Sequence, residues 1–257
     1  MKKHVKIAIF LSLLITVIAG CSSSNQKASE KKYRVATDPV WPPFEMVDEK
    51  TKEITGFDID LMNAIAENQG FAVEYVNVNF DALIPGVGTC QYDAGASAIT
   101  ITDERKKQML FSDPYVNIGQ VMVVREDVND LVNKEDFAGK VIGAQTGTTG
   151  AIMAEEWQTE GLVTFRGYDT IDLAYMDLKN GQIDGVLGDS TMAEAYVKSM
   201  GGLKIVGDQY SSEELAFAVC KDNKDLLDKI NAGLKALKES GKFDEIYKKY
   251  FEQSVNK

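Results

Sequence analysis

A short turn rich in glycine and threonine, Thr146-Gly147-Thr148-Thr149-Gly150, stands between an apolar stretch at residues 141–144 and a helical stretch at residues 151–159. A turn that joins a strand to a helix leaves free backbone N–H groups at the helix start, and these groups bind anions. The turn lacks the lysine of a nucleotide-binding loop, which argues against a phosphate site. The pattern therefore indicates either a carboxylate site or a plain strand-to-helix connection.

Arg105 is a second group that could bind a carboxylate. It follows the run Thr100-Ile101-Thr102 at the start of an expected helix. A guanidinium can hold a carboxylate through two parallel charge-assisted hydrogen bonds, which a lysine ammonium cannot match. Two lysines follow Arg105 directly, so the spacing alone favours the alternative, a solvated surface charge.

The chain lacks the residues of several catalytic and metal sites. Its only histidine, His4, lies in the N-terminal segment, so the remainder has no Ser-His-Asp triad, no histidine base and no histidine metal site. Cys90 and Cys220 are too few for a cysteine zinc site or a disulfide scaffold. In an exported protein such a pair can form one bridge or remain as two buried thiols. We expect neither a metal nor a cofactor.

The N-terminus predicts export. Three lysines within the first six residues precede an apolar run, residues 7–19, that is too short for a comfortable membrane span. An uncleaved anchor helix is the alternative. Residues 17–21 resemble a bacterial lipobox, in which cleavage leaves Cys21 to be lipidated, and a polar, serine-rich stretch follows. We therefore expect a signal peptide over residues 1–20, and a lipidated tether over residues 21–32 that holds the protein at the outer face of the cell membrane or in the periplasm.

The mature chain is strongly acidic. The full sequence has a net charge of −11, and removal of the signal leaves 25 basic and 39 acidic residues, a net charge of −14. This balance argues against nucleic acid as a partner and against electrostatic docking on anionic lipid. No second apolar stretch could span a bilayer, so the lipid is the only membrane attachment that we expect.

Short apolar strands alternate with helical stretches through most of the chain. Residues 34–36, 73–78, 141–144 and 185–188 have the pattern of strands. Between the first two, a helical face begins near Phe57, with Thr55 or Asp58 as its possible cap and Gly70 as its end. Such alternation implies parallel sheets covered by helices, an α/β fold. Aromatic residues between 243 and 251 are expected mostly in the core.

Several blocks occur in a characteristic order along the chain. They are Ala36-Thr37-Asp38 with Trp41-Pro42-Pro43-Phe44-Glu45, Gly56-Phe57-Asp58-Ile59-Asp60-Leu61, Asn79-Phe80-Asp81-Ala82-Leu83-Ile84-Pro85, Ile99 to Lys107, Phe111-Ser112-Asp113-Pro114-Tyr115, Gly147-Thr148-Thr149-Gly150 and Phe243 to Phe251. Together they resemble the family 3 solute-binding proteins of amino-acid ABC transporters. The glutamine-, histidine- and lysine/arginine/ornithine-binding proteins belong to that family. The resemblance covers nearly all of the mature chain.

The resemblance implies the two-lobed fold of the type II periplasmic binding proteins, which close on a ligand like a hinged clam. Lobe 1 would comprise residues 33–117 and 215–257, and lobe 2 residues 125–208. Residues 118–124 and 209–214 would be the two hinge crossings. Ligand contacts shared between the lobes favour the closed state, because only that state makes both sets.

The resemblance also implies a role for individual residues in binding a free amino acid. Arg105 and Thr149 would bind the ligand carboxylate from opposite lobes, and Asp189 would bind its ammonium, although an aspartate that caps the following helix is the alternative. Trp41 and Phe80 would sandwich the ligand side chain. The other implied contacts are Asp38, Ser97, Ala98, Thr100, Gln145 and Thr146.

Two departures bear on the ligand. The glutamine-binding relative has a lysine where Gln145 stands and a histidine where Gly188 stands, which weakens a glutamine assignment. Asp38, Gln145, Thr149 and an aromatic floor suit arginine or lysine slightly better, while glutamine and histidine stay open. The resemblance further implies that Cys90 and Cys220 lie at the same end of two antiparallel strands, where a disulfide can form.

The predicted function is therefore the substrate-binding component of an ABC importer, a monomer that passes a polar amino acid to the permease subunits without breaking a bond in it. One alternative is an exported dehydratase-like enzyme on the same fold, with Asp38, Asp189 or Glu45 as acid or base. Another is the ligand-binding domain of a sensor, which needs a membrane-spanning output segment.

Overall fold

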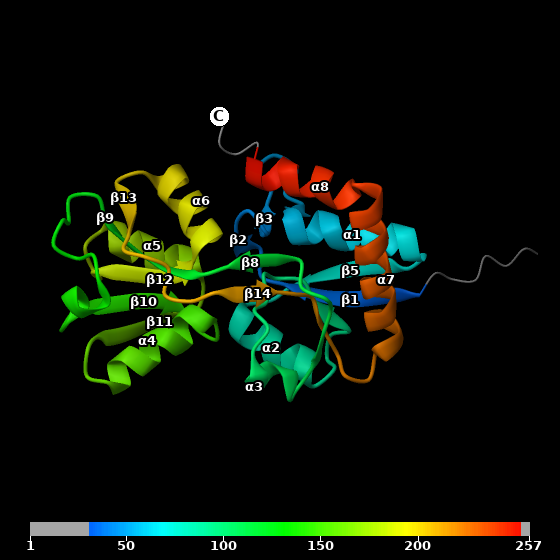
Figure 1. Ribbon diagram of the computed structural model, residues 1–257, viewed down its shortest axis with the longest axis horizontal. Helices are drawn as coiled ribbons and strands as arrows, with labels where there is room; N and C mark the ends of the chain where they lie inside the picture. Colours follow the sequence, from blue (N-terminus) through cyan, green and yellow to red (C-terminus); the bar gives the residue numbers. More distant parts are fainter. Residues whose placement is uncertain (1–30, 253–257) are drawn as a thin grey trace, which may run out of the picture.

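The structure, a computed structural model, describes residues 31–252 and places them in two lobes that lie side by side (Figure 1). Each lobe is built around a five-stranded sheet. The predicted signal peptide, Cys21 and the tether up to residue 30 lie outside the described residues. Within residues 31–252, no helix has both the length and the apolar character needed to cross a bilayer. The predicted two-lobed α/β architecture is confirmed.

In lobe 1 the sheet has the strand order β5-β1-β6-β15-β7. β1 runs parallel to β5 and β6, whereas β15 is antiparallel to β6 and β7. The strands are β1 (Lys32–Thr37), β5 (Ala72–Asn77), β6 (Ala94–Gly95), β7 (Leu110–Phe111) and β15 (Ala218–Val219), beside a small sheet of β2 (Val40–Trp41), β3 (Glu45–Val47) and β4 (Ile54–Thr55). The helices are α1 (Phe57–Gln69), α2 (Phe80–Gly88), α3 (Asp103–Lys106), α7 (Lys224–Ser240), α8 (Lys242–Tyr247) and the π-helical η2 (Lys248–Glu252).

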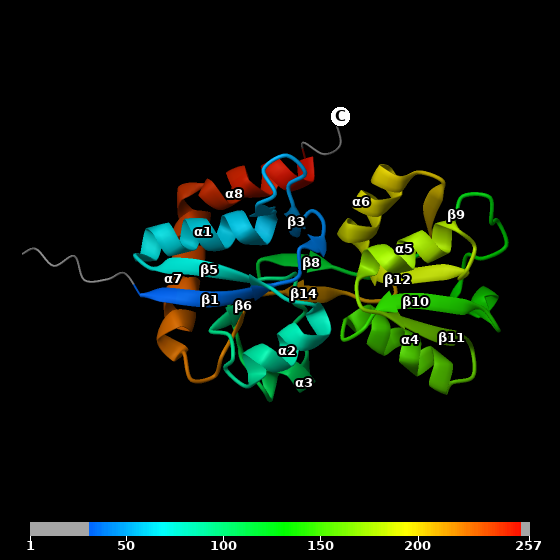
Figure 2. The same ribbon diagram turned by 180° about the vertical axis from the view of Figure 1, so that it is seen from behind.

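In lobe 2 the strand order is β11-β10-β12-β9-β13, with β9 antiparallel to both of its neighbours. The strands are β9 (Gln120–Arg125), β10 (Val141–Gln145), β11 (Thr164–Tyr168), β12 (Gly185–Asp189) and β13 (Leu203–Val206). The helices are η1 (Lys134–Phe137), α4 (Thr149–Thr159), α5 (Ile171–Lys179) and α6 (Ser190–Met200). Figures 1 and 2 show α4 on the face of this sheet opposite to α5 and α6.

Two antiparallel segments join the lobes, β8 (Val116–Ile118) and β14 (Glu213–Leu215). The prediction of the first crossing over residues 118–124 is wrong, because residues 120–125 form β9 inside the lobe 2 sheet, and lobe 2 therefore begins at Gln120. A run of buried valines in a central strand has no sequence feature that separates it from a crossing. The crossings approach closely at Gly119, where a Cβ atom would lie 2.3 Å from the Ser211 carbonyl oxygen.

The ends of three strands face the boundary between the lobes. Asp38 follows β1 in lobe 1, whereas Gln145 and Asp189 are the last residues of β10 and β12 in lobe 2. The carboxyl ends of parallel strands are where open α/β sheets bind ligands. The topology therefore brings polar side chains of both lobes to one place.

Helix α1 begins without a side-chain cap. Its N-cap is Gly56, with φ 136°, and a Cβ there would lie 2.1 Å from the Phe44 carbonyl oxygen. The predicted cap at Thr55 or Asp58 is wrong, because the Asp58 carboxylate accepts the Ala98 N–H at 2.9 Å and the Tyr115 hydroxyl at 2.7 Å. Asp58 therefore fixes the position of a segment that lies between the lobes.

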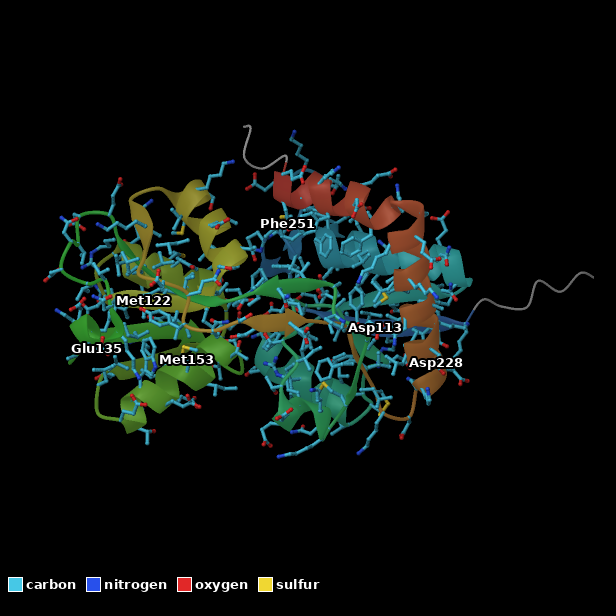
Figure 3. The ribbon with its side chains drawn as sticks, viewed as in Figure 1. Asp113, Met122, Glu135, Met153, Asp228 and Phe251 are labelled. Carbon is cyan, nitrogen blue, oxygen red and sulfur yellow. A yellow bond between two sulfur atoms is a disulfide. The ribbon has the colours of Figure 1, made fainter. Side chains whose placement is uncertain are left out.

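The aromatic residues near the C-terminus pack into lobe 1, as predicted. The Phe57 ring has its centroid 5.9 Å from that of Phe243, 6.0 Å from that of Tyr247 and 5.1 Å from that of Phe251. Figure 3 labels Phe251 at the end of this segment. These contacts hold the last helices against α1, so that the chain's return from lobe 2 completes lobe 1.

Cys90 and Cys220 form a disulfide in lobe 1, with Cα atoms 5.0 Å apart and a sequence separation of 130. Cys90 lies shortly before β6 and Cys220 directly follows β15, and these two strands are antiparallel neighbours. The bridge therefore ties the N-terminal part of lobe 1 to the part that returns after lobe 2.

Replacing both cysteines by serine is expected to lower the free energy of unfolding by about 2–4 kcal/mol, because the bridge restricts a long loop of the unfolded chain. Amino-acid binding should be unchanged, since neither cysteine lies between the lobes. Calorimetric melting of both proteins with and without reducing agent checks this. Equal sensitivity of the two proteins to the reductant, or two free thiols found by mass spectrometry of the exported protein, contradicts the expectation.

Candidate ligand-binding site

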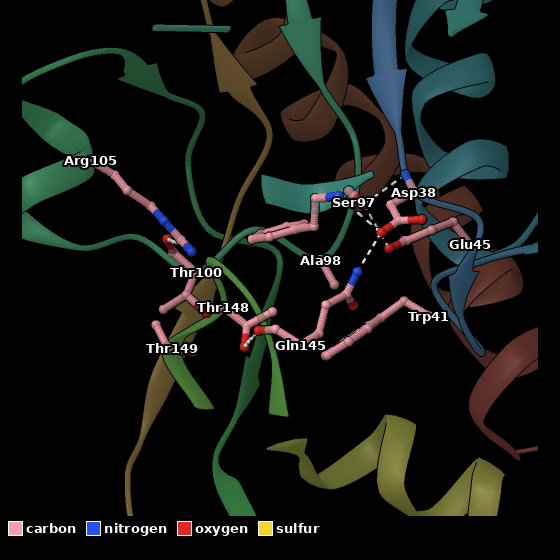
Figure 4. A pocket seen from close by; sticks show the side chains of 11 residues that line it. Asp38, Trp41, Glu45, Ser97, Ala98, Thr100, Arg105, Gln145, Thr148 and Thr149 are labelled. Atoms are coloured by element: carbon pink, nitrogen blue, oxygen red, sulfur yellow. Dashed lines mark hydrogen bonds between the residues drawn. The ribbon is translucent and has the colours of Figure 1, made fainter. Parts of the chain in front are cut away.

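A small cavity lies between the lobes (Figure 4). All the predicted contact residues except Thr146 and Asp189 line it, and Glu45 and Thr148 join them. The lining residues are Asp38, Trp41, Glu45, Phe80, Ser97, Ala98, Thr100, Arg105, Gln145, Thr148 and Thr149. The structure thus gathers residues that are far apart in sequence and come from both lobes.

Thr146 does not reach this cavity. Its side chain is exposed, and its backbone N–H donates to the Tyr168 carbonyl oxygen at 2.9 Å, which continues the pairing of β10 with β11. Only Thr148 and Thr149 of the glycine-threonine turn therefore line the cavity. Thr146 still pairs with β11, because the hydrogen bonding of β10 continues one residue past the strand.

Arg105 is buried, with 6% of its surface exposed, so it is not a solvated surface charge. Its Nη1 donates to the Thr100 carbonyl oxygen at 2.8 Å, and its Nη2 crosses to lobe 2 and donates to the Gly147 carbonyl oxygen at 2.9 Å. Burial lowers the pKa of Arg105 to about 10, and the charges of Asp189 and Glu213 oppose this shift. The guanidinium therefore stays charged at neutral pH.

The start of α4 faces this guanidinium. Thr148 caps the helix, because its hydroxyl accepts the Ala151 N–H at 3.1 Å while it donates to the Gln145 carbonyl oxygen at 2.7 Å. Within residues 31–252, the structure gives the Thr149 N–H no hydrogen-bond acceptor. A free N–H at a helix start and a buried guanidinium are groups that can bind a carboxylate.

The opposite side of the cavity is acidic, and Figure 4 shows Asp38 and Glu45 there, across from Arg105. The Oδ2 atom of Asp38 accepts the Phe80 N–H at 3.0 Å and the Gln145 amide at 2.7 Å. Burial raises the pKa of Asp38 to about 6, despite these two hydrogen bonds. The hydrogen bond from the Gln145 side-chain amide to Asp38 crosses from lobe 2 to lobe 1.

Glu45 is fully buried and was not among the predicted ligand contacts. Its Oε1 accepts the Ser97 hydroxyl at 3.0 Å, whereas its Oε2 and the Oε1 of Gln145 have no partner within residues 31–252. Burial, and then the negative charge of Asp58, raise the pKa of Glu45 well above its ordinary value. The only sequence signal for Glu45 is a charged residue that ends the block Trp41-Pro42-Pro43-Phe44-Glu45.

Asp189 lies at the N-terminus of α6, but its side chain does not cap that helix. Its Oδ2 accepts the Trp41 indole N–H of lobe 1 at 2.9 Å, and its Oδ1 accepts the Gln120 amide at 2.6 Å. Burial and then the charge of Glu213 raise the pKa of Asp189 to about 7, while these hydrogen bonds and Arg105 lower it. A buried carboxylate held by neutral donors is suited to accept an ammonium.

The aromatic residues Trp41 and Phe80 both line the cavity. The guanidinium carbon of Arg105 lies 5.4 Å from the centroid of the Phe80 ring, so this ring meets a cation on one face. Trp41 lines the cavity from β2 and is held by its bond to Asp189. An aromatic surface next to carboxylates can bury the methylenes of a ligand and attract its cationic end.

Residues 33–253 match the family described as bacterial extracellular solute-binding proteins, family 3. The chain belongs to this family. One relative of this solute-binding protein is the ABC transporter arginine-binding protein 1 of Escherichia coli strain K12. The two are 34% identical over 250 residues, and the match covers 95% of this chain and 98% of that protein.

Solved structures agree with this assignment. An ancestral arginine-binding protein bound to arginine is 39% identical, with a TM-score of 0.82, over 86% of this chain and 99% of that one. An ancestral arginine-binding protein bound to glutamine is also 39% identical, with a TM-score of 0.81, over 86% of this chain and 98% of that one. The solute-binding protein therefore shares its fold with proteins that hold amino acids.

Replacing Arg105 with lysine is expected to weaken amino-acid binding by about 100-fold, because the guanidinium that can hold a carboxylate through two hydrogen bonds is lost. The ligand-free protein should keep its fold, and Asp189→Asn should have a similar effect. Isothermal titration calorimetry and circular dichroism measure the two properties. The matched control is Lys106→Ala, whose side chain is 58% exposed. Binding by Arg105→Lys at the wild-type level would show that the carboxylate site lies elsewhere.

The ligand-free protein is expected to lose stability as the pH rises from about 5.5 to 8. The pKa values of Asp38, Asp58 and Asp189 in the fold, about 6, about 7 and about 7, lie above their ordinary 3.8. In this range the folded state holds more protons than the unfolded state, so unfolding becomes easier as protons are removed. Melting temperatures measured across this pH range show whether stability falls as the pH rises.

Asp38→Asn and Asp189→Asn are the controls for this pH dependence, and each should flatten the curve. A saturating cationic amino acid should raise the melting temperature more at pH 8 than at pH 5.5, because it meets ionised carboxylates only at the higher pH. A melting temperature of the ligand-free protein that rises with pH would contradict this electrostatic account.

Proposed function

We propose that this solute-binding protein captures a free L-amino acid with a cationic side chain, arginine before lysine, between its lobes. The observation that carries the proposal is the opposition of charges across the cavity. Arg105 and the free N–H of Thr149 lie at one side, and Asp38 and Glu45 lie at the other (Figure 4). A zwitterion with a basic side chain matches this distribution, because its carboxylate and its cation lie at opposite ends.

A guanidinium fits the acidic side better than a neutral amide does. Glu45 Oε2 and Gln145 Oε1 have no partner within residues 31–252 and need N–H donors, and Asp38 bonds to the same Gln145 amide. A guanidinium presents several donors in one plane, whereas the amide of glutamine offers two hydrogens together with an oxygen that would face these acceptors. The same comparison places arginine before lysine, whose ammonium is a compact point charge.

The relatives support this choice of ligand. The Escherichia coli relative is an arginine-binding protein, and one of the similar ancestral proteins was solved with arginine. The ancestral protein solved with glutamine makes that amino acid the appropriate comparison ligand. Histidine remains a further comparison, because a relative in Neisseria gonorrhoeae is a probable histidine-binding protein.

We further propose that the protein works outside the cytoplasm, as a monomer held by a lipid on Cys21, and passes its ligand to the permease of an ABC importer. The sequence features of residues 1–21 support export and lipidation. A lobe pair that closes around a ligand offers the permease a shape that reports occupancy. The family and the curated relatives are binding proteins, which supports a role in binding and not in catalysis.

A screen of the twenty amino acids against ligand-stripped protein tests the ligand. L-arginine is expected to raise the melting temperature most, because selective binding to the native state stabilises it. Asp38→Asn should reduce the ratio of arginine affinity to glutamine affinity by about tenfold, as a charge-assisted contact is lost. Calorimetric titration gives both affinities. If no amino acid shifts the melting temperature, the proposed function is wrong.

A further inference from the structure

The hinge crossings contribute a carboxylate that bonds to both lobes. Glu213, at the start of β14, accepts at its Oε2 the hydroxyl of Thr100 from lobe 1 at 2.8 Å and the hydroxyl of Thr149 from lobe 2, also at 2.8 Å. Its Oε1 accepts the hydroxyl of Ser211 at 2.6 Å. Two residues of the candidate site, from opposite lobes, thus meet on one oxygen atom that belongs to neither lobe.

A second buried side chain extends these contacts to Asp189. Gln120 is fully buried, and its Nε2 donates to Thr149 Oγ1 at 3.1 Å and to Asp189 Oδ1 at 2.6 Å. An amide nitrogen has two hydrogens, so each acceptor receives one. The hydrogen bonds therefore form one continuous chain from Thr100 through Glu213, Thr149 and Gln120 to Asp189.

This chain limits what the threonine hydroxyls can do. A hydroxyl has one hydrogen, so a threonine that donates to Glu213 cannot donate to a ligand carboxylate at the same time. The carboxylate is then left to Arg105 and to the N–H of Thr149. Arg105 itself bonds to the Thr100 carbonyl oxygen, so the position of Thr100 also helps to hold the guanidinium.

The geometry makes the contacts specific to one arrangement of the lobes. Two hydrogen bonds of 2.8 Å to a single oxygen atom, one from each lobe, exist only while the lobes keep one relative position. Bonds to a carboxylate are charge-assisted and stronger than bonds between neutral groups. Glu213 has no ion-pair partner within residues 31–252, so the hydroxyl donors are its specific contacts.

We propose that Glu213 is a positioning residue of ligand capture, which holds Thr100 and Thr149 on one oxygen atom when the lobes close and thereby slows ligand release. Gln120 transmits the same constraint to Asp189, so that the sites for the carboxylate and the ammonium are set together. This inference rests on the proposed function, because it concerns the sites for the α-carboxylate and the α-ammonium that every free amino acid carries. Glu213 acts through the threonines and does not contact the ligand.

The test compares Glu213→Gln with Glu214→Gln, the same change at an exposed neighbour on the same strand. Glu213→Gln should release L-arginine about tenfold faster, while the association rate changes by less than about threefold, because the lost bonds exist only in the closed state. Glu214→Gln should leave both rates unchanged. Stopped-flow tryptophan fluorescence can follow release, since Trp41 lines the cavity. An unchanged release rate in Glu213→Gln overturns the proposal.

A double-mutant cycle distinguishes positioning from a general loss of structure. In a Thr149→Val background, Glu213→Gln should change the release rate by less than about twofold, because its lobe 2 partner is already absent. Thr149→Ser keeps the hydroxyl, so in that background Glu213→Gln should again speed release by about tenfold. Multiplicative effects of the two substitutions on the release rate would show that Glu213 does not act through Thr149.

Measurements on the ligand-free protein test the role of Glu213 independently of which amino acid is the ligand. Small-angle X-ray scattering should give a larger radius of gyration for Glu213→Gln than for wild type and Glu214→Gln. If the wild type binds neither L-arginine nor L-glutamine, the proposed function fails, and the scattering comparison alone decides the role of Glu213. Equal radii in that case overturn the hinge proposal.

Discussion

The structure depends on burying more negative than positive charge between two lobes. Asp38 and Glu45 line the cavity and Asp189 is buried against Trp41, whereas Arg105 is the cation among the lining residues. A carboxylate removed from water is costly unless partners replace its hydration. Within residues 31–252 neutral groups take that role, namely an indole N–H, two side-chain amides, a hydroxyl and a backbone N–H. The raised pKa values show that these donors compensate only in part.

The imbalance explains why each lobe needs the other. Asp38 of lobe 1 takes its amide from Gln145 of lobe 2, and Asp189 of lobe 2 takes its indole N–H from Trp41 of lobe 1. Opening the lobes would break these bonds and return the groups to water. A ligand that brings its own cations and carboxylate can replace the same contacts with stronger ones, which links recognition to closure.

The crossings between the lobes also supply hydrogen-bonding groups to this arrangement. Gly119 permits the close approach of the crossings, because a side chain there would collide with the Ser211 carbonyl oxygen. Close approach in turn lets Ser211 bond to Glu213, whose other oxygen meets a threonine of each lobe. The two crossings and the proposed carboxylate site are therefore joined by a few hydrogen bonds.

The sequence by itself determined the α/β class, the order of the motifs and most residues that line the cleft. Those motifs are local, and a turn such as residues 146–150 carries its conformation in its own residues. The tertiary structure decided that Arg105 is buried, that Glu45 lines the cavity and that Thr146 does not. It also decided that residues 120–125 form a strand, and that Gln120 and Glu213 join the two lobes. The physical reason is that side-chain partners such as Gln120 and Thr149, or Trp41 and Asp189, are 29 and 148 residues apart, and no local pattern records their meeting.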